Sequence, residues 1–285
     1  MSEVGNESGI KDQGKSKETS IRLKISTRVG LGVLIENPSK IPVVGKEFLK
    51  EIPPNGKVVI ATTHLSDADV PIATYALSDY FDITIVHHST HDNPFEDAWS
   101  WTGAVVAGRK NFLSIKSRKE ERKVIADFAP EDFEPMKSAL EIGKTVVIAA
   151  HNPTYDWKLS RKGGLGAVYL AQISDALILP VSVNIESESK SGAVVDMRQA
   201  ISKNKKKLKA QVSIGQPINF DKIDVQRMTE ILRRRREGES LSPEEKREFS
   251  EVNAKLREQS KIVMGSLAEM LPPAKRGIWE SGKES

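Results

Sequence analysis

Cysteine is absent from the 285-residue chain, and this absence excludes several kinds of chemistry. Without thiols there are no disulfide bonds, no thiolate nucleophile, no iron–sulfur cluster and no cysteine-ligated zinc. Long apolar runs are also missing, since none approaches the ~20 residues that span a bilayer. Residues 1–20 lack the apolar core of a signal peptide. We therefore expect a cytoplasmic protein, attached at most peripherally to the cytoplasmic face of a membrane.

A large excess of charge of one sign is missing too. The chain has 43 basic and 39 acidic residues, a formal net charge of +4. A dedicated nucleic-acid binder needs basic residues that dominate one face, so no nucleic-acid partner is expected. The length fits one large domain or two small ones.

Short β-branched runs alternate with helical segments along most of the chain. Strands are predicted at 58–62, 83–86, 104–107, 145–150, 177–183 and 211–214, and helices near 68–80, 116–128, 132–142 and 164–174. The runs are nearly continuous in apolar residues, which is typical of strands covered on both faces. The sequence therefore predicts an α/β fold with a largely parallel central sheet flanked by helices.

The two ends of the chain differ from this central part. Residues 1–20 have almost nothing to bury and are predicted to be a disordered tail. Residues 21–220 are predicted to form the α/β domain, and 221–285 a C-terminal helical extension with charged helices at 224–236 and 242–271. An apolar stripe from Phe249 to Met270 predicts that the longer helix packs on the core or on a partner.

Histidine is scarce, and its placement is informative. His64, the His87–His88 pair and His151 each come at or just after the end of a predicted strand. The carboxyl ends of parallel strands share one edge, where ligands usually bind. A histidine at such a position is also a common capping or packing residue, so both interpretations stay open.

The sharpest local signal is His64 followed by Asp69 at a predicted helix start. A neutral imidazole accepts a proton near pH 7, and a nearby carboxylate can orient its ring. Asp69 is the first candidate for that carboxylate and Asp67 the second. Ser66, beside the helix start, is predicted to be an N-cap rather than a nucleophile.

The sequence from His87 to His91 also suggests a metal site, because catalytic zinc needs three protein ligands. Neighbouring side chains of an extended segment point to opposite faces, so His87 and His88 are poorly placed to share one ion. A polar wall of a substrate pocket and a purely structural role are the alternatives. No metal ligand is predicted here.

The segment after the 58–62 strand resembles the first motif block of the glycerolipid acyltransferase superfamily. That block, in the lysophosphatidic acid (1-acylglycerol-3-phosphate) acyltransferase group, reads Asn-His-x-Ser-x-x-Asp-x-Pro. The chain matches it at His64, Ser66, Asp69 and Pro71, with Thr63 where Asn is usual. Further resemblances follow in the family's order over about residues 41–218, namely Val43–Pro53, Gly103–Arg109, Lys158–Gly163, Leu179–Val181 and Ile214–Ile218.

The third block departs from the family pattern. Where the family has Pro-Glu-Gly-Thr-Arg-Ser, this chain has Ala150–Tyr155, with His151 at the Glu position and Thr154 at the Arg position. The resemblance alone therefore leaves the acceptor open. Side chains that are expected to bind substrate or its anionic group are Thr63, Ser66, Arg109, His151, Asn152, Thr154, Lys158, Arg161 and Lys162. A solvated loop is the alternative for Lys158–Lys162.

The resemblance implies an O-acyltransferase of phospholipid metabolism. His64, oriented by Asp69, is the expected general base, acyl-CoA or acyl-carrier protein the acyl donor, and a lysophospholipid or related glycerolipid the acceptor, without a cofactor. A thioesterase-like or metal-dependent hydrolase and a non-catalytic lipid-binding relative are the alternatives. Basic runs at 203–209 and 233–236 are either solvated faces or contacts for an anionic membrane surface.

Overall fold

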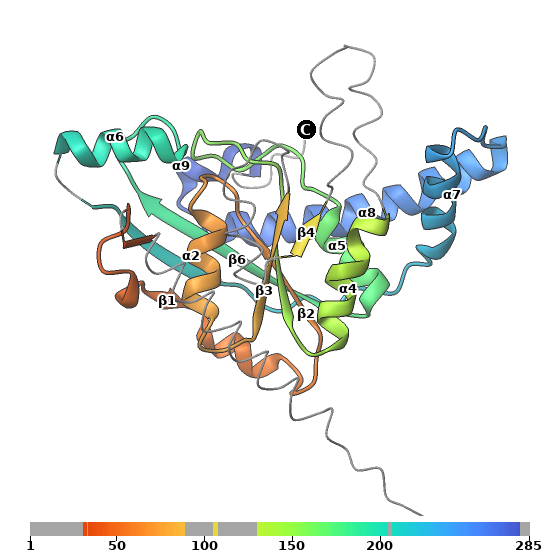
Figure 1. Cartoon of the computed structure of the whole chain (residues 1–285), viewed down its shortest axis with the longest axis horizontal. Helices are drawn as coiled ribbons and strands as arrows, with labels where there is room; N and C mark the ends of the chain where they lie inside the picture. The colour runs from red at the N-terminus through yellow and green to blue at the C-terminus, as the bar shows by residue number, and fades with distance from the viewer. Residues whose placement is uncertain (1–30, 33, 89–104, 108–129, 205–206, 280–285) are drawn as a thin grey trace, which may run out of the picture.

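A seven-stranded sheet forms the centre of the computed structural model, which describes residues 31–32, 34–88, 105–107, 130–204 and 207–279 (Figure 1). The strand order in this part of the chain is β1-β7-β6-β2-β5-β3-β4. The strands are β1 (Val43–Val44), β2 (Val58–Thr62), β3 (Ile83–His88), β4 (Val105–Ala107), β5 (Thr145–Ala149), β6 (Leu177–Glu186) and β7 (Lys209–Ile214).

Strand β2 lies at the middle of the sheet and runs parallel to both of its neighbours. Its last residue, Thr62, is in register with Ala149 of β5 and with Val181 of β6. Strands β3 and β4 continue the parallel part beyond β5. Strand β7 pairs antiparallel with β6, and β1 is parallel to β7. The predicted largely parallel α/β sheet is thus confirmed.

Helices cover both faces of the sheet. Successive residues of β2 point to opposite faces and therefore belong to two different apolar clusters. Val58 and Ile60 join one cluster with α2, while Val59 and Ala61 join the other with α4, α5, α7 and α8 (Figure 1). The helices are α2 (Asp69–Leu77), α4 (Glu134–Glu141), α5 (Gly166–Ser174), α6 (Val194–Asn204), α7 (Gln226–Arg236), α8 (Pro243–Glu269) and α9 (Pro273–Arg276). Short 3-10 helices lie at Pro38–Lys40, Lys46–Glu51, Pro130–Phe133 and Gly277–Trp279.

The long helix α8 packs along the sheet face that α4 and α5 also cover (Figure 1). Leu256, Val263 and Leu267 of its apolar stripe are buried in that cluster. Ser242 caps the helix in a reciprocal capping box with Glu245. This arrangement accounts for the apolar stripe, whereas the division of the chain at 220 stays a prediction.

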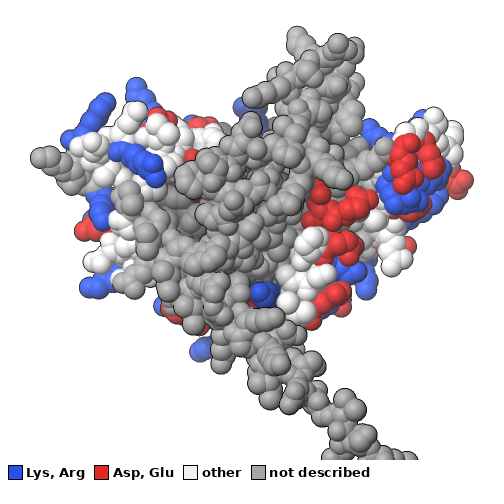
Figure 2. Space-filling model, viewed as in Figure 1, with Lys and Arg blue, Asp and Glu red and all other residues white. Residues whose placement is uncertain are grey.

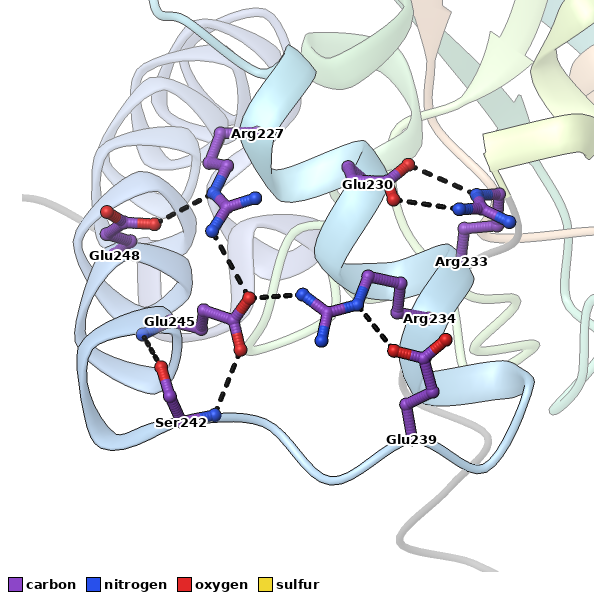
Figure 3. Close-up of polar contacts among 8 residues, drawn as sticks. All are labelled: Arg227, Glu230, Arg233, Arg234, Glu239, Ser242, Glu245 and Glu248. Atoms are coloured by element: carbon purple, nitrogen blue, oxygen red, sulfur yellow. Dashed lines mark hydrogen bonds and ion pairs between the residues drawn. The ribbon is translucent and has the colours of Figure 1, made fainter.

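Three arginines of α7 are paired with acidic side chains around them (Figure 3). Arg233 forms ion pairs with Glu230 of its own helix and with Glu237, the C-cap residue of that helix. Arg234 reaches Glu239 and Glu245. Arg227 bonds Glu245 and Glu248, which joins α7 to the start of α8.

Several sequence-based predictions lie outside the described residues: the tail at 1–20, the helix at 116–128, His91 and Arg109. Helix α6 was not predicted. No helix in the described ranges is long and apolar enough to cross a bilayer.

Candidate functional site

The site begins where β2 ends. Thr63 is fully buried, and its backbone N–H donates to the carbonyl of Val181 on β6 at 3.3 Å. Its hydroxyl oxygen then accepts the backbone N–H of Val183 at 3.0 Å. Since β2 ends opposite Val181, this side chain satisfies a β6 amide that no strand covers. Thr63 thereby fixes the turn that follows to the sheet.

Asp69, the first residue of α2, lies folded back onto this turn. Its Oδ2 accepts the N–H of Leu65 at 2.9 Å, and its Oδ1 accepts the hydroxyl of Ser66. The nearby Thr63 hydroxyl also lowers the pKa of the carboxyl. The side chain is completely buried, and burial raises its pKa to about 6 against the opposing effect of Ser66, Leu65 and Thr63.

Ser66 is not the N-cap that the sequence predicts. Ala68 occupies that position, and the Ser66 hydroxyl instead donates to Asp69 while accepting the N–H of Ala68 at 3.2 Å. A buried carboxylate is the stronger acceptor, so it takes the hydroxyl hydrogen. Ser66 therefore supports Asp69.

His64 lies between this turn and the loop that follows β5. Its backbone N–H donates to Nε2 of His151 at 3.1 Å, and its carbonyl accepts the N–H of Thr154 at 3.2 Å. The half-buried imidazole meets the ring of Tyr155 edge-on, with centroids 6.2 Å apart and planes at 76°. The predicted meeting of His64 and His151 at one sheet edge follows from the pairing of β2 with β5.

His151 is held as a neutral imidazole. Because Nε2 accepts the His64 amide, the ring hydrogen lies on Nδ1, which donates to the carbonyl of Asn152 at 2.7 Å. Burial lowers the pKa of His151 to about 4. Both ring nitrogens are bonded to backbone groups, so this side chain fixes the position of the His64 backbone.

A second set of contacts ties the turn to the segment before α6. Asp67 Oδ2 accepts the N–H of Val194 at 2.8 Å. Burial and the nearby Asp67 carboxylate raise the pKa of the Tyr155 phenol. Gly192 donates its N–H to the Tyr155 carbonyl at 2.6 Å. A Cβ on Gly192 would lie 2.4 Å from the Leu65 carbonyl oxygen, so only glycine fits here. Asp67 is thus used to hold the turn.

The site loop, residues 150–163, contains two residues with left-handed backbone conformations. Tyr155 has φ 57° and Trp157 has φ 64°. Such a conformation is strained for bulky residues and persists only where surrounding contacts hold it. Trp157 donates its indole N–H to the Ser189 carbonyl at 3.0 Å, which supplies one such contact.

The remaining predicted binding residues lie further out. Asn152, Lys158, Arg161 and Lys162 are exposed, and the Thr154 hydroxyl donates to the Lys158 carbonyl at 2.8 Å. Their role in binding an anion stays a prediction. His87 and His88 belong to the end of β3, and their side chains, like Arg109 and His91, fall outside the description.

Lys275 is the residue of this neighbourhood that sequence reasoning missed. It belongs to α9, and its ammonium donates to the Ile185 carbonyl at 2.6 Å and lies 5.0 Å from the centroid of the Trp157 ring. Its charge acts on Asp69 and on Glu186. A lysine in a charged C-terminal segment carries no signal of this position, which only the folded chain creates.

No protein-family model matches the chain, and no curated protein matches it. Among solved structures, the chain is similar to the 1-acyl-sn-glycerophosphate (LPA) acyltransferase PlsC from Thermotoga maritima. That match has 15% sequence identity and a TM-score of 0.39, and it covers 87% of this chain and 79% of the other. At this TM-score the similarity carries no conclusion about activity or substrate.

Proposed function

We propose that the protein is an O-acyltransferase that moves an acyl chain from a thioester to the hydroxyl of a lysophospholipid or related glycerolipid. The observation that carries the proposal is the position of His64. It follows the central strand at the carboxyl edge of the parallel sheet, in a turn that also holds the buried carboxyl of Asp69. The order of motif resemblances along residues 41–218 supports the same function.

In the proposed reaction, His64 removes the proton of the acceptor hydroxyl as its oxygen attacks the thioester carbonyl. The carbon–sulfur bond then breaks, and the thiol of CoA or acyl-carrier protein leaves with the proton that the imidazole returns. General-base catalysis of this kind contributes ~10²–10⁴-fold in rate. Holding both substrates together contributes much of the rest. The reaction needs no covalent acyl-enzyme, which suits a chain without cysteine.

Asp69 has two roles in this proposal. As a carboxylate it stabilises the imidazolium that forms on His64, and through Leu65 and Ser66 it fixes the turn that carries the histidine. His151, neutral and bonded on both ring nitrogens, positions the His64 backbone and takes no proton. The exposed Lys158, Arg161 and Lys162 are proposed to bind the anionic group of the acceptor.

The test follows thiol release from acyl-CoA with and without lysophosphatidic acid. We expect release that depends on the acceptor and that falls by ~10²–10⁴-fold in His64→Gln. Lys261→Met, on the exposed side of α8, is the matched surface control and should retain full activity. Unchanged turnover in His64→Gln would overturn the role of His64. Release that needs no acceptor would instead identify a hydrolase.

A further inference from the structure

Strand β6 extends past the end of β2, and this extension leaves backbone groups to be satisfied. Val183 and Ile185 are two residues apart, so they direct their backbone groups to the same side of the strand. The Val183 N–H donates a hydrogen bond to the Thr63 hydroxyl oxygen at 3.0 Å. The Ile185 carbonyl accepts a hydrogen bond from the Lys275 ammonium at 2.6 Å. Two side chains from distant parts of the sequence thus take the place of the missing strand.

This arrangement places the lysine beside the stretch of β6 that the Asp69 turn also contacts. The Thr63 hydroxyl that accepts the Val183 N–H also lowers the pKa of Asp69, and Ile185 lies only about 7 Å further along β6. The ammonium also lies over the Trp157 ring, which shields part of the charge from water. A cation and a carboxyl in such a poorly hydrated space interact more strongly than on the surface.

The C-terminal segment, residues 272–279, is bonded to the site loop at several points. Leu159 donates its N–H to the Lys275 carbonyl at 2.9 Å, and Trp279 donates its indole N–H to the Ser160 carbonyl at 3.0 Å. The same loop supplies the Thr154 amide that bonds the His64 carbonyl. The position of the lysine is therefore built by the fold, and the segment also supports the loop beside the histidine.

We propose that Lys275 is a positioning residue of the His64 site, held by the C-terminal segment as the counter-charge of Asp69. Besides Asp69, Glu186 on β6 acts electrostatically on Lys275. The other titratable groups that the described residues place at the site are Asp67 on the turn, and His64, His151 and Tyr155 on the two strand-end loops. The kinetic consequence rests on the proposed function, whereas the electrostatic coupling does not.

The coupling has a consequence that depends on pH. Burial raises the pKa of Asp69 to about 6, and the Lys275 charge opposes that rise. Without the ammonium the pKa of Asp69 rises further, so a larger fraction is protonated at pH 7. A protonated Asp69 cannot stabilise an imidazolium on His64. Activity should then be lost near neutral pH and recovered at higher pH.

The test compares Lys275→Met with Lys275→Arg and with Arg276→Met, which removes the neighbouring charge of the same helix. The Asp69 carboxyl carbon is titrated by NMR in each folded protein, without any substrate. We expect a higher Asp69 pKa in Lys275→Met than in wild type, and a value near wild type in the other two. In the acyl-transfer assay, the acidic limb of the rate profile should move to higher pH by the same amount.

An unchanged Asp69 titration in Lys275→Met would overturn the proposal, even if activity falls. Equal loss of activity at every pH would also overturn it, because that result indicates a structural role alone. A shifted titration in a protein that transfers no acyl group would keep the coupling and reject the proposed function. If Lys275→Met does not fold, the Lys275 ammonium is titrated in Asp69→Asn, where its pKa should fall; an unchanged value there overturns the proposal.

Discussion

The protein holds its positive charges in two contrasting settings. The arginines of α7 form a conspicuous run in the sequence, yet Arg233 and Arg234 lie on the surface and are each paired with two glutamates (Figure 3). Lys275 has no such run around it, but it is half-buried between Ile185 and Trp157, and burial lowers its pKa while the Asp69 charge raises it. The comparison teaches that the surroundings of a charge, rather than the density of charge along the sequence, decide what it does.

The same contrast bears on the predicted membrane contact. Figure 2 shows basic and acidic side chains intermingled over α7, so this region presents both signs of charge to a partner. Of the lysine run at 203–209, Lys207 donates to the Gly32 carbonyl at 2.6 Å, while Lys203 and Lys209 are exposed. A contact with an anionic membrane surface stays a prediction, and the described lysines carry it better than the arginines.

The largest difference between the two settings should appear when a carboxyl group is removed from each. In wild type, Asp69 has a folded pKa of about 6 against an ordinary value of 3.8, so its protonated form favours folding. That contribution is complete below pH 4 and is lost as pH rises through 6, a change on the order of a few kcal/mol. Asp69→Asn should therefore gain stability relative to wild type across this range, as urea unfolding at several pH values measures.

Glu245→Gln, in the arginine network, is the matched comparison. Its pKa is lowered by the Ser242 amide and by Arg234, so the charged form favours folding and the difference from wild type has the opposite sign. Salt should shrink the Glu245 effect, because its partners Arg227 and Arg234 reach solvent, and leave the effect of the completely buried Asp69 nearly intact. If the stability difference from wild type changed with pH in the same direction for both variants, the contrast between the Asp69 and Glu245 carboxyl groups would be contradicted.

A smaller effect is expected from filling space beside the turn. Gly192→Ala places a Cβ against Leu65 and Ser66, so it should cost about 1–3 kcal/mol in unfolding free energy and lower activity. Gly265→Ala, on α8, meets no atom within 4 Å and should instead stabilise the helix by about 0.5–1 kcal/mol. Thermal unfolding of both variants measures the difference, and a stabilising Gly192→Ala would show that the turn is looser than described.

The smallest effects belong to the surface of α7 and α8. Ser242→Ala removes the N-cap of α8 and should cost about 1 kcal/mol. Arg233→Met breaks only exposed pairs within α7 and should leave the unfolding midpoint almost unchanged. Denaturant unfolding with both variants measures this, and neither should alter acyl transfer. A larger loss of stability in Arg233→Met than in Ser242→Ala would contradict the expectation that these exposed ion pairs contribute little to stability.

Much of the fold is predictable because the strands are short runs of apolar, β-branched residues. The run Val58–Thr62 is predicted and observed with identical bounds, and the helix that follows begins at Asp69 as its acidic residue suggests. The direction of β7 is not predictable in this way, since an apolar run carries no information on the sign of its pairing. The sequence does not predict helix α6 either, because a polar segment beside a lysine run resembles a loop.

The site is only partly predictable for a similar reason. The pairing of His64 with His151 follows from two neighbouring parallel strands, a relation that strand-end positions indicate. The contact of Lys275 with Ile185 depends on where β2 ends relative to β6, and no local pattern records that length difference. The prediction that Ser66 is an N-cap is wrong. A serine near a helix start usually caps the helix, whereas here the buried Asp69 carboxyl accepts the hydrogen of its hydroxyl.

The central claim is that His64 acts as the base in acyl transfer, and one measurement tests it most directly. Wild type and His64→Gln are each incubated with an isotope-labelled acyl thioester and a lipid extract, and labelled products are identified by mass spectrometry. The account predicts a labelled acyl ester of a lysolipid from wild type and almost none from His64→Gln. Equal amounts of that ester from both proteins, or labelled free fatty acid alone from wild type, would contradict it.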